Sequence, residues 1–184
     1  MNRTYKIAVF QGDGIGPEIM APTIEILHRL AQSSGAYTFE MNALSAGAAH
    51  YAKSGESLPQ ASMDAARSAD AILLSAMGLP NVRYPDGTEI SPQIELRKTL
   101  KLFAGVRPVT VRSGQESPLK IPPGRKVDFV LIRESTEGLF FSQGAGEVTA
   151  DQAQETLLIT REVSEKLFRF AFNLAQTRKA SKRG

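Results

Sequence analysis

Apolar and polar positions alternate along this chain in a way that predicts strands followed by helices. The first apolar run, residues 7–11, stops at a glycine-rich turn, residues 12–16, and apolar positions then recur at helical spacing to about residue 30. Pro17 suits the first turn of this helix, because its missing N–H would have no partner there in any case. The apolar stripe that we expect to face the core consists of Ile19, Ile26, Leu27 and Leu30.

The remaining pattern extends this alternation over the whole chain. We expect further strands at residues 37–44, 71–76, 105–111 and 127–132, an edge strand at 156–159, and helices at residues 46–53, 59–69, 93–103 and 161–178. The sequence AILLSA at 71–76 is apolar on both faces, which is typical of buried strands in parallel sheets. Two segments rich in glycine and proline, 77–92 and 112–124, are expected to be loops. The alternation favours an α/β fold with a largely parallel sheet.

The last predicted helix carries more apolar surface than one side of a helix can bury. We expect Thr160 to be its N-cap. Its apolar residues cover more than one stripe, namely Val163, Leu167, Phe168, Phe170, Ala171, Phe172 and Leu174. Because a helix that is apolar on most sides is buried on most sides, we expect either a second subunit or further polypeptide to cover it.

The residue types present exclude several kinds of site. The chain of 184 residues has no cysteine, which excludes disulfides, thiolate metal sites and cysteine nucleophiles. Its two histidines, His28 and His50, have no catalytic neighbour in sequence, so we expect them to be solvated or hydrogen-bonded. There is no apolar run of about 18 residues and no signal peptide before the first strand, so a cytoplasmic protein without membrane contact is expected.

Much of the formal net charge of +3 comes from the C-terminal tail, through Arg178, Lys179, Lys182 and Arg183. Basic tails can bind nucleic acid, but the chain has no aromatic or glycine motif of an RNA-binding module. A solvated helix end is the favoured interpretation, and nucleic acid is not an expected partner. Binding that weakens steeply with salt would indicate a nucleic-acid-binding module instead.

The glycine-rich turn allows two interpretations. A dinucleotide fingerprint has glycines at relative positions 1, 3 and 6, followed by an acidic residue about 20 residues later. Here the glycines are Gly12, Gly14 and Gly16, Pro17 fills the sixth position, and the next acidic strand end, Glu40, is too distant. The simpler interpretation is an ordinary tight turn between a strand and a helix.

Three arginines stand within or at the ends of predicted elements. Arg97 lies in a predicted helix, whereas Arg107 and Arg133 lie in or just after predicted strands. Arginine is always charged and binds a carboxylate through two parallel hydrogen bonds. In open α/β sheets ligands bind beyond the carboxyl ends of the strands. Together the three could hold a di- or tricarboxylate, although their spacing alone fits three unrelated surface arginines equally well.

Three motifs, in order along the chain, resemble one family. The segments GDGIGPE at 12–18, LRK with LFAGVRP at 96–108, and RESTEGLFF at 133–141 resemble the isopropylmalate/isocitrate dehydrogenase family of β-decarboxylating dehydrogenases. The resemblance implies a two-domain α/β fold distinct from Rossmann, with residues 1–102 in the first, cofactor-side domain and 103–184 in the second. It also implies oxidative decarboxylation of a 2-hydroxy acid, NAD or NADP as hydride acceptor, Mg²⁺ or Mn²⁺ as Lewis acid, and a homodimer.

The resemblance also implies three groups of site residues. The arginines that bind substrate carboxylates correspond to Arg97, Arg107 and Arg133. The part that approaches the cofactor corresponds to Ile15, Ser75, Met77 and Gly78. The segment that selects the substrate corresponds to Ile90, Ser91, Gln93 and Ile94. In that segment the serine fits isocitrate and the isoleucines fit an isopropyl group, so 3-isopropylmalate or a related malate-type acid is expected and the exact acid is open.

The chain departs from the family pattern in two respects. Phe140 stands seven residues after Arg133, where the family has the tyrosine that protonates the enolate, and phenylalanine has no proton to give. The family's catalytic lysine and metal-binding aspartates correspond to positions after Gly184, so neither a catalytic residue nor a metal ligand is assigned within the chain. We therefore expect an N-terminal half that is inactive alone and needs a C-terminal half. The alternative, favoured by Phe140, is a non-catalytic carboxylate- or nucleotide-binding protein of the same fold.

Overall fold

The computed structural model describes residues 3–111, 120–121, 127–142 and 144–181. The chain forms two compact units, Met1–Leu100 and Lys101–Gly184, which are described separately below. The loop predicted at 112–124 lies outside the described residues except for residues 120–121.

The first unit is built on a parallel sheet, as the alternation of strands and helices predicts. Its strands are β1 (Arg3–Phe10), β2 (Tyr37–Leu44) and β3 (Ala71–Leu74), in the order β2-β1-β3. The strand β1 pairs in parallel with both neighbours, with Phe10 opposite Leu44 on one side and Leu74 on the other. The carboxyl ends of all three strands therefore lie at the same edge of the sheet.

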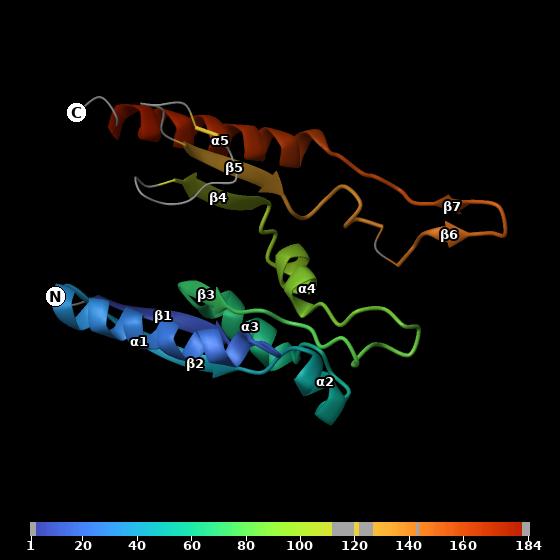
Figure 1. Cartoon of the computed structure of the whole chain (residues 1–184), viewed down its shortest axis with the longest axis horizontal. Helices are drawn as coiled ribbons and strands as arrows, with labels where there is room; N and C mark the ends of the chain where they lie inside the picture. The colour runs from blue at the N-terminus through green and yellow to red at the C-terminus, as the bar shows by residue number, and fades with distance from the viewer. Residues whose placement is uncertain (1–2, 112–119, 122–126, 143, 182–184) are drawn as a thin grey trace. The chain divides into compact units, whose positions relative to one another are not determined.

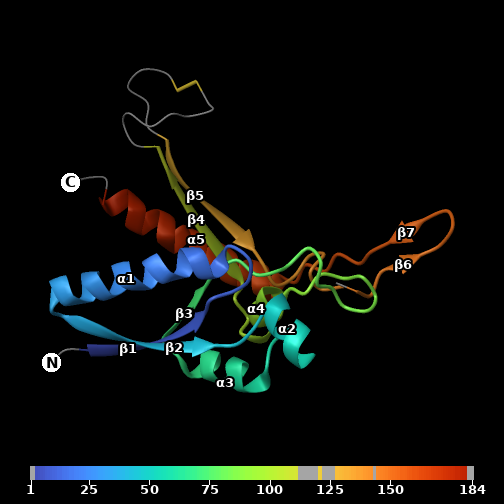
Figure 2. The same cartoon turned by 60° about the horizontal axis from the view of Figure 1, so that its bottom comes forward.

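Helices cover both faces of this sheet. The helices of the first unit are α1 (Gly16–Ser34), α2 (Ala48–Ser54), α3 (Gln60–Ser68) and α4 (Pro92–Thr99). Figure 2 shows α1 on one face of the strands and α3 on the other. Alternate side chains of β1 point to opposite faces of the sheet and pack into two separate hydrophobic cores. Ile7 and Val9 pack with Met20 of α1, and Ala8 and Phe10 belong to the second core with Met63, Ala66 and Leu96.

The helix α1 buries a different stripe from the one that the sequence indicated. Ile19 and Ile26 are 45% and 57% exposed, and Leu30 is exposed as well. The buried residues of α1 are Gly16, Met20 and Ala31. Two of these three residues are small, which lets the helix approach the sheet closely. The helix is therefore apolar on two sides, and hydrophobic spacing alone did not identify the inner one.

The strand β3 is also less buried than its apolar sequence indicates. Ala71 and Leu74 are exposed, and the two residues between them are only half-buried. Among the described strands β3 pairs with β1 alone, so it forms an edge of the sheet. The expected burial on both faces is therefore wrong for the chain as it stands.

The second unit contains antiparallel pairs. The strands β4 (Ala104–Thr110) and β5 (Asp128–Glu134) pair antiparallel, and so do the short strands β6 (Glu147–Val148) and β7 (Ala153–Gln154). The predicted edge strand at 156–159 is wrong, because only an isolated bridge between Gly138 and Leu158 forms there.

The last helix, α5 (Arg161–Ser181), packs along β5 (Figure 1). Its predicted cap is confirmed, since the N–H of Val163 donates to Thr160 Oγ1 at 3.3 Å. Near its other end Arg178 forms an ion pair with Asp128. The helix α5 therefore covers the face of the β4–β5 pair from which the Asp128 side chain projects. Phe168 and Phe172 remain exposed, the latter by 71%. None of the helices in the described part of the chain is long and apolar enough to span a membrane.

Candidate functional site

The glycines of the first turn are required by close packing. Gly12 has φ +77°, and a Cβ there would lie 1.9 Å from the carbonyl oxygen of Ala76. A Cβ on Gly16 would lie 2.5 Å from the carbonyl oxygen of Gln11. The turn therefore presses against the segment after β3, and its glycines have a steric reason that involves no phosphate.

Asp13, between two of these glycines, is the residue that sequence reasoning missed. Its side chain is 3% exposed. The N–H groups of Ala48, Ala49 and Gly78 donate to its carboxylate at N···O distances of 2.7, 2.9 and 3.0 Å. Asp13 thus caps the first turn of α2 and ties it to the loop after β3. The signal was only indirect. Gly47, the residue before α2, has no side chain that could accept hydrogen bonds from the first N–H groups of the helix, so the acceptor had to come from elsewhere in the chain.

The four expected cofactor residues come together at this turn. The N–H of Asp13 donates to the carbonyl of Ala76 at 2.8 Å, which joins the turn carrying Ile15 to the segment carrying Ser75, Met77 and Gly78. Ser75 is buried, and its hydroxyl donates to the carbonyl of Gly16 at 3.0 Å. Ile15 is exposed and Met77 half-buried. Ile15 and Met77 present apolar side chains here, while the N–H groups of Ala48, Ala49 and Gly78 already donate to Asp13.

The expected specificity segment leads into α4. Ile90 is 1% exposed and packs in the interior, whereas Ser91, Ile94 and Arg97 are half-buried. Gln93 lies one helical turn before Arg97, and its Oε1 atom is buried without a hydrogen-bond partner among the described residues. Ile90 therefore offers no surface to a ligand in this structure, and Ser91 and Ile94 are the accessible members of the segment.

Arg107 and Arg133 lie on the same face of the β4–β5 pair. Arg107 is directly opposite Leu131, and Leu131 and Arg133 are two residues apart on β5, so all three side chains project from one face. Such diagonal neighbours have backbones about 7–8 Å apart, within reach of long side chains. Both arginines are exposed, and no ion pair among the described residues includes Arg97, Arg107 or Arg133.

Arg133 also contacts Phe140, the residue that is expected to stand where the family has a tyrosine. Its Cζ atom lies 5.2 Å from the centroid of the Phe140 ring, within the range of a cation–π interaction. Both residues line a pocket of about 590 Å³ in the second unit. The rest of the lining is Glu134, Glu137, Gly138, Leu139, Ile159, Ser164, Leu167 and Phe168. The pocket is thus apolar over much of its wall, with Arg133 as its one cationic side chain.

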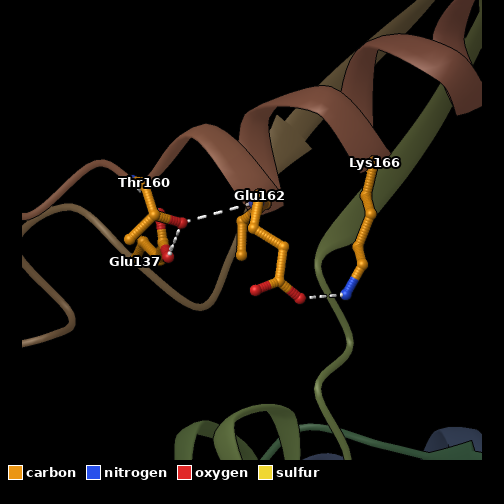
Figure 3. A network of polar contacts seen from close by, with 5 residues as sticks. Glu137, Thr160, Glu162 and Lys166 are labelled. Atoms are coloured by element: carbon orange, nitrogen blue, oxygen red, sulfur yellow. Dashed lines mark hydrogen bonds and ion pairs between the residues drawn. The ribbon is translucent and has the colours of Figure 1, made fainter.

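The two carboxylates of this wall hold the chain itself. Glu134 accepts hydrogen bonds from the N–H groups of Thr136 and Glu137 at 2.6 and 2.8 Å, and from the Thr136 hydroxyl. Glu137 accepts from the N–H and the hydroxyl of Thr160 at 2.8 and 2.6 Å. Figure 3 shows Glu137 and Thr160 facing each other at the start of α5, two residues before Glu162, which forms an ion pair with Lys166. The motif after β5 is therefore fastened to the N-terminus of α5.

Acid should weaken the second unit through Glu134. Partial burial alone would raise the pKa of Glu134, but hydrogen bonds from the Thr136 hydroxyl and from nearby N–H groups outweigh it and lower that pKa. A carboxyl whose pKa is lower in the folded state than in the unfolded state, here near 4.5, stabilises the fold at any pH above that unfolded value. This contribution to stability is lost as the pH falls through the folded-state pKa.

We expect Glu134→Gln to lower the unfolding temperature at pH 7, and the gap to the parent chain to close on acidification below about pH 4.5. Thermal unfolding followed by circular dichroism between pH 3 and 7 measures this gap. Glu147→Gln, at an exposed carboxylate of β6, is the matched control. A gap that stays constant with pH would contradict this role of Glu134.

The described residues do not present a metal site. No three histidine, aspartate or glutamate side chains of the described segments are grouped closely enough to hold a metal ion. Hard divalent cations such as Mg²⁺ require several oxygen ligands at one point. The carboxylates nearest to Arg133 are instead bound to N–H and hydroxyl groups, so they do not fit a metal ion.

The amino-acid sequence is similar to those of known dehydrogenases. The family model described as isocitrate/isopropylmalate dehydrogenase matches residues 6–183. The 3-isopropylmalate dehydrogenase of Staphylococcus saprophyticus is 36% identical over 177 residues, and that of Streptococcus thermophilus is 38% identical over 180. These alignments cover 95% of this chain, which spans about half the length of each relative, 51% and 50%.

Solved structures agree with the sequence comparison. The crystal structure of isocitrate dehydrogenase from Methylococcus capsulatus matches with a TM-score of 0.73 and 28% identity, over 95% of this chain and 48% of that one. A β-decarboxylating dehydrogenase from Thermococcus kodakarensis in its apo form matches with a TM-score of 0.63 and 29% identity, over 95% and 46%. The matches in sequence and in structure both run over nearly the whole chain, which therefore belongs to the isocitrate/isopropylmalate dehydrogenase family.

Proposed function

We propose that this chain provides the carboxylate-binding side of an NAD(P)- and metal-dependent dehydrogenase that oxidatively decarboxylates a 2-hydroxy acid. The proposed substrate is 3-isopropylmalate or a related malate-type acid. In this proposal residues 1–102 belong to the cofactor-side domain and 103–184 to the second domain. The complete cytoplasmic enzyme is a homodimer, and each subunit needs the C-terminal half that relatives possess.

The observation that carries the proposal is the pair Arg107 and Arg133. Both side chains project from one exposed face of the β4–β5 pair, and no ion pair among the described residues includes either of them. A ligand with two carboxylates could form charge-assisted hydrogen bonds with both guanidinium groups. The resemblance to the family also assigns Arg97, on α4 of the first unit, to carboxylate binding.

The chain's own residues then bind and orient the acid. In the second unit Arg107 and Arg133 hold its carboxylates, and in the first unit Ser91 and Ile94 correspond to the family's specificity segment. Ile15, Met77 and Gly78 provide an apolar edge for the planar ring of the cofactor, which supplies the hydride acceptor when bound. Ser75 is buried and supports this edge from beneath through its hydrogen bond to Gly16. The described carboxylates of this chain do not fit a metal ion.

Replacing Arg107 with lysine should weaken malate binding about tenfold. A lysine ammonium keeps the charge but cannot form the two parallel hydrogen bonds of a guanidinium, and a hydrogen bond to a charged group is worth about 1.5–3 kcal/mol. Calorimetric or NMR titration of the chain with malate measures the change.

Arg169→Lys on α5 is the matched control for this titration, because Arg169 is an exposed arginine of the same unit outside the Arg107–Arg133 face. Unchanged affinity in both Arg107→Lys and Arg133→Lys would refute the carboxylate assignment.

A second candidate function is carboxylate binding without catalysis. Phe140 favours it, because the residue at the family's proton-donor position has no acidic hydrogen and instead contacts Arg133. A chain that binds malate with its arginines, and that shows no turnover even when a C-terminal half is supplied, would support this candidate over the dehydrogenase.

A further inference from the structure

We propose that Phe140 is a positioning residue that holds the Arg133 guanidinium extended for carboxylate binding. This inference rests on the proposed function, because it assigns Arg133 to a carboxylate ligand. It gives the phenylalanine a role that is different from proton donation.

The first argument is that the position directly opposite Arg133 on the neighbouring strand offers no side chain to pack against. The residue directly opposite it on β4 is Gly105, which has no side chain to pack against. A Cβ on Gly105 would lie 3.8 Å from Arg133 Cβ and 3.1 Å from Ser135 Oγ, so the position has little space for a larger residue. An exposed arginine here would sample many rotamers without a contact from elsewhere. The aromatic ring of Phe140 is the contact that the structure provides.

The second argument is that the turn carrying Phe140 is firmly anchored. The N–H of Gly138 donates to the carbonyl of Leu158 at 2.7 Å, and Glu137 binds Thr160 through two hydrogen bonds. Two residues after Phe140 in the chain, Ser142 is buried and its hydroxyl donates to the carbonyl of Thr156 at 2.6 Å. These attachments on both sides fix the backbone of the turn, so the ring is a stable surface for the guanidinium.

The third argument is chemical. A guanidinium that packs on an aromatic ring still directs its N–H groups outward in its own plane, so it can bind a carboxylate with two hydrogen bonds. The ring therefore restricts Arg133 without consuming its donors. A contact of this kind at an exposed site is worth about 0.5–1 kcal/mol, which corresponds to a two- to fivefold change in affinity.

The test uses NMR of the whole chain with ¹⁵N-labelled arginine. The ring current of Phe140 should move the Arg133 Nε–H resonance, which is assigned by its loss in Arg133→Lys. We expect this displacement to disappear in Phe140→Leu and to persist in Phe140→Tyr. Phe141→Leu, at the adjacent exposed phenylalanine, is the matched control and should leave the resonance in place.

Malate titration of the same samples provides the second readout. We expect Phe140→Leu to weaken binding two- to fivefold and Phe140→Tyr to retain the parent affinity. An Arg133 resonance that does not move in Phe140→Leu, or a moved resonance with unchanged malate affinity, would overturn the positioning role. A parent chain that shows the displaced resonance and does not bind malate would refute the proposed function, while the ring contact itself would be supported.

Discussion

Asp13→Ala should destabilise the first unit by roughly 3–6 kcal/mol. The carboxylate accepts hydrogen bonds from three N–H groups, each hydrogen bond to a charged group being worth about 1.5–3 kcal/mol, and their contributions are not fully additive. Alanine would also leave these N–H groups without an acceptor. Since whole domains are stable by only about 5–15 kcal/mol, much of the first unit should unfold. Urea denaturation followed by circular dichroism measures the loss.

Two variants sharpen this test. Asp13→Asn keeps one oxygen acceptor and should lose less stability than Asp13→Ala. Asp64→Ala removes an exposed aspartate of α3, whose partners are the surface residues Gln60 and Arg67, and should change stability by less than about 1 kcal/mol. Equal effects of Asp13→Ala and Asp64→Ala would show that the buried carboxylate does not hold the turn.

The second large effect concerns catalysis. We expect the chain alone to show no dehydrogenase turnover. Oxidation of a 2-hydroxy acid requires removal of the hydroxyl proton, and the proposed function assigns this base to the half of the relatives that this chain does not span. The described residues offer no group of metal ligands, and Phe140 cannot donate a proton. The assay follows NAD(P)H absorbance with Mg²⁺ or Mn²⁺ and isopropylmalate, isocitrate, tartrate or malate.

The full-length 3-isopropylmalate dehydrogenase of Streptococcus thermophilus is the positive control for this assay. Turnover by the 184-residue chain at ordinary enzyme rates, about 1–10³ per second, would overturn the assignment of the missing groups. A chain that is inactive and also aggregates would fit the exposed apolar stripe of α1, whose Ile19 and Ile26 are open to solvent.

Local sequence signals predicted the elements of this fold well. The strand at residues 37–44 has the predicted bounds, and the Thr160 cap lies at the predicted position. Both depend on residues close in sequence. The inner stripe of α1 and the exposure of β3 depend on which elements pack together, so spacing could not decide them. The antiparallel pairing of β4 with β5 is likewise a contact between distant residues, which spacing along the chain could not decide.

The site was predictable to a similar extent. The arginines could be named from motifs, but their arrangement on one face of β4 and β5 requires the strand register. The contact between Arg133 and Phe140 requires the shape of the turn after β5. Asp13 could not be identified as a cap, because its partners lie 35, 36 and 65 residues further along the chain.

These separations have a consequence for the order of folding. Contacts between residues far apart in sequence are slow to form, because the intervening chain must first be closed into a loop. The Asp13 carboxylate therefore receives its last donor only after Gly78 has been synthesised and β3 has joined the sheet. Until then a charged group destined for the interior must remain in water. We infer that the glycine-rich turn, although nearly first along the chain, is among the last parts of the first unit to become rigid.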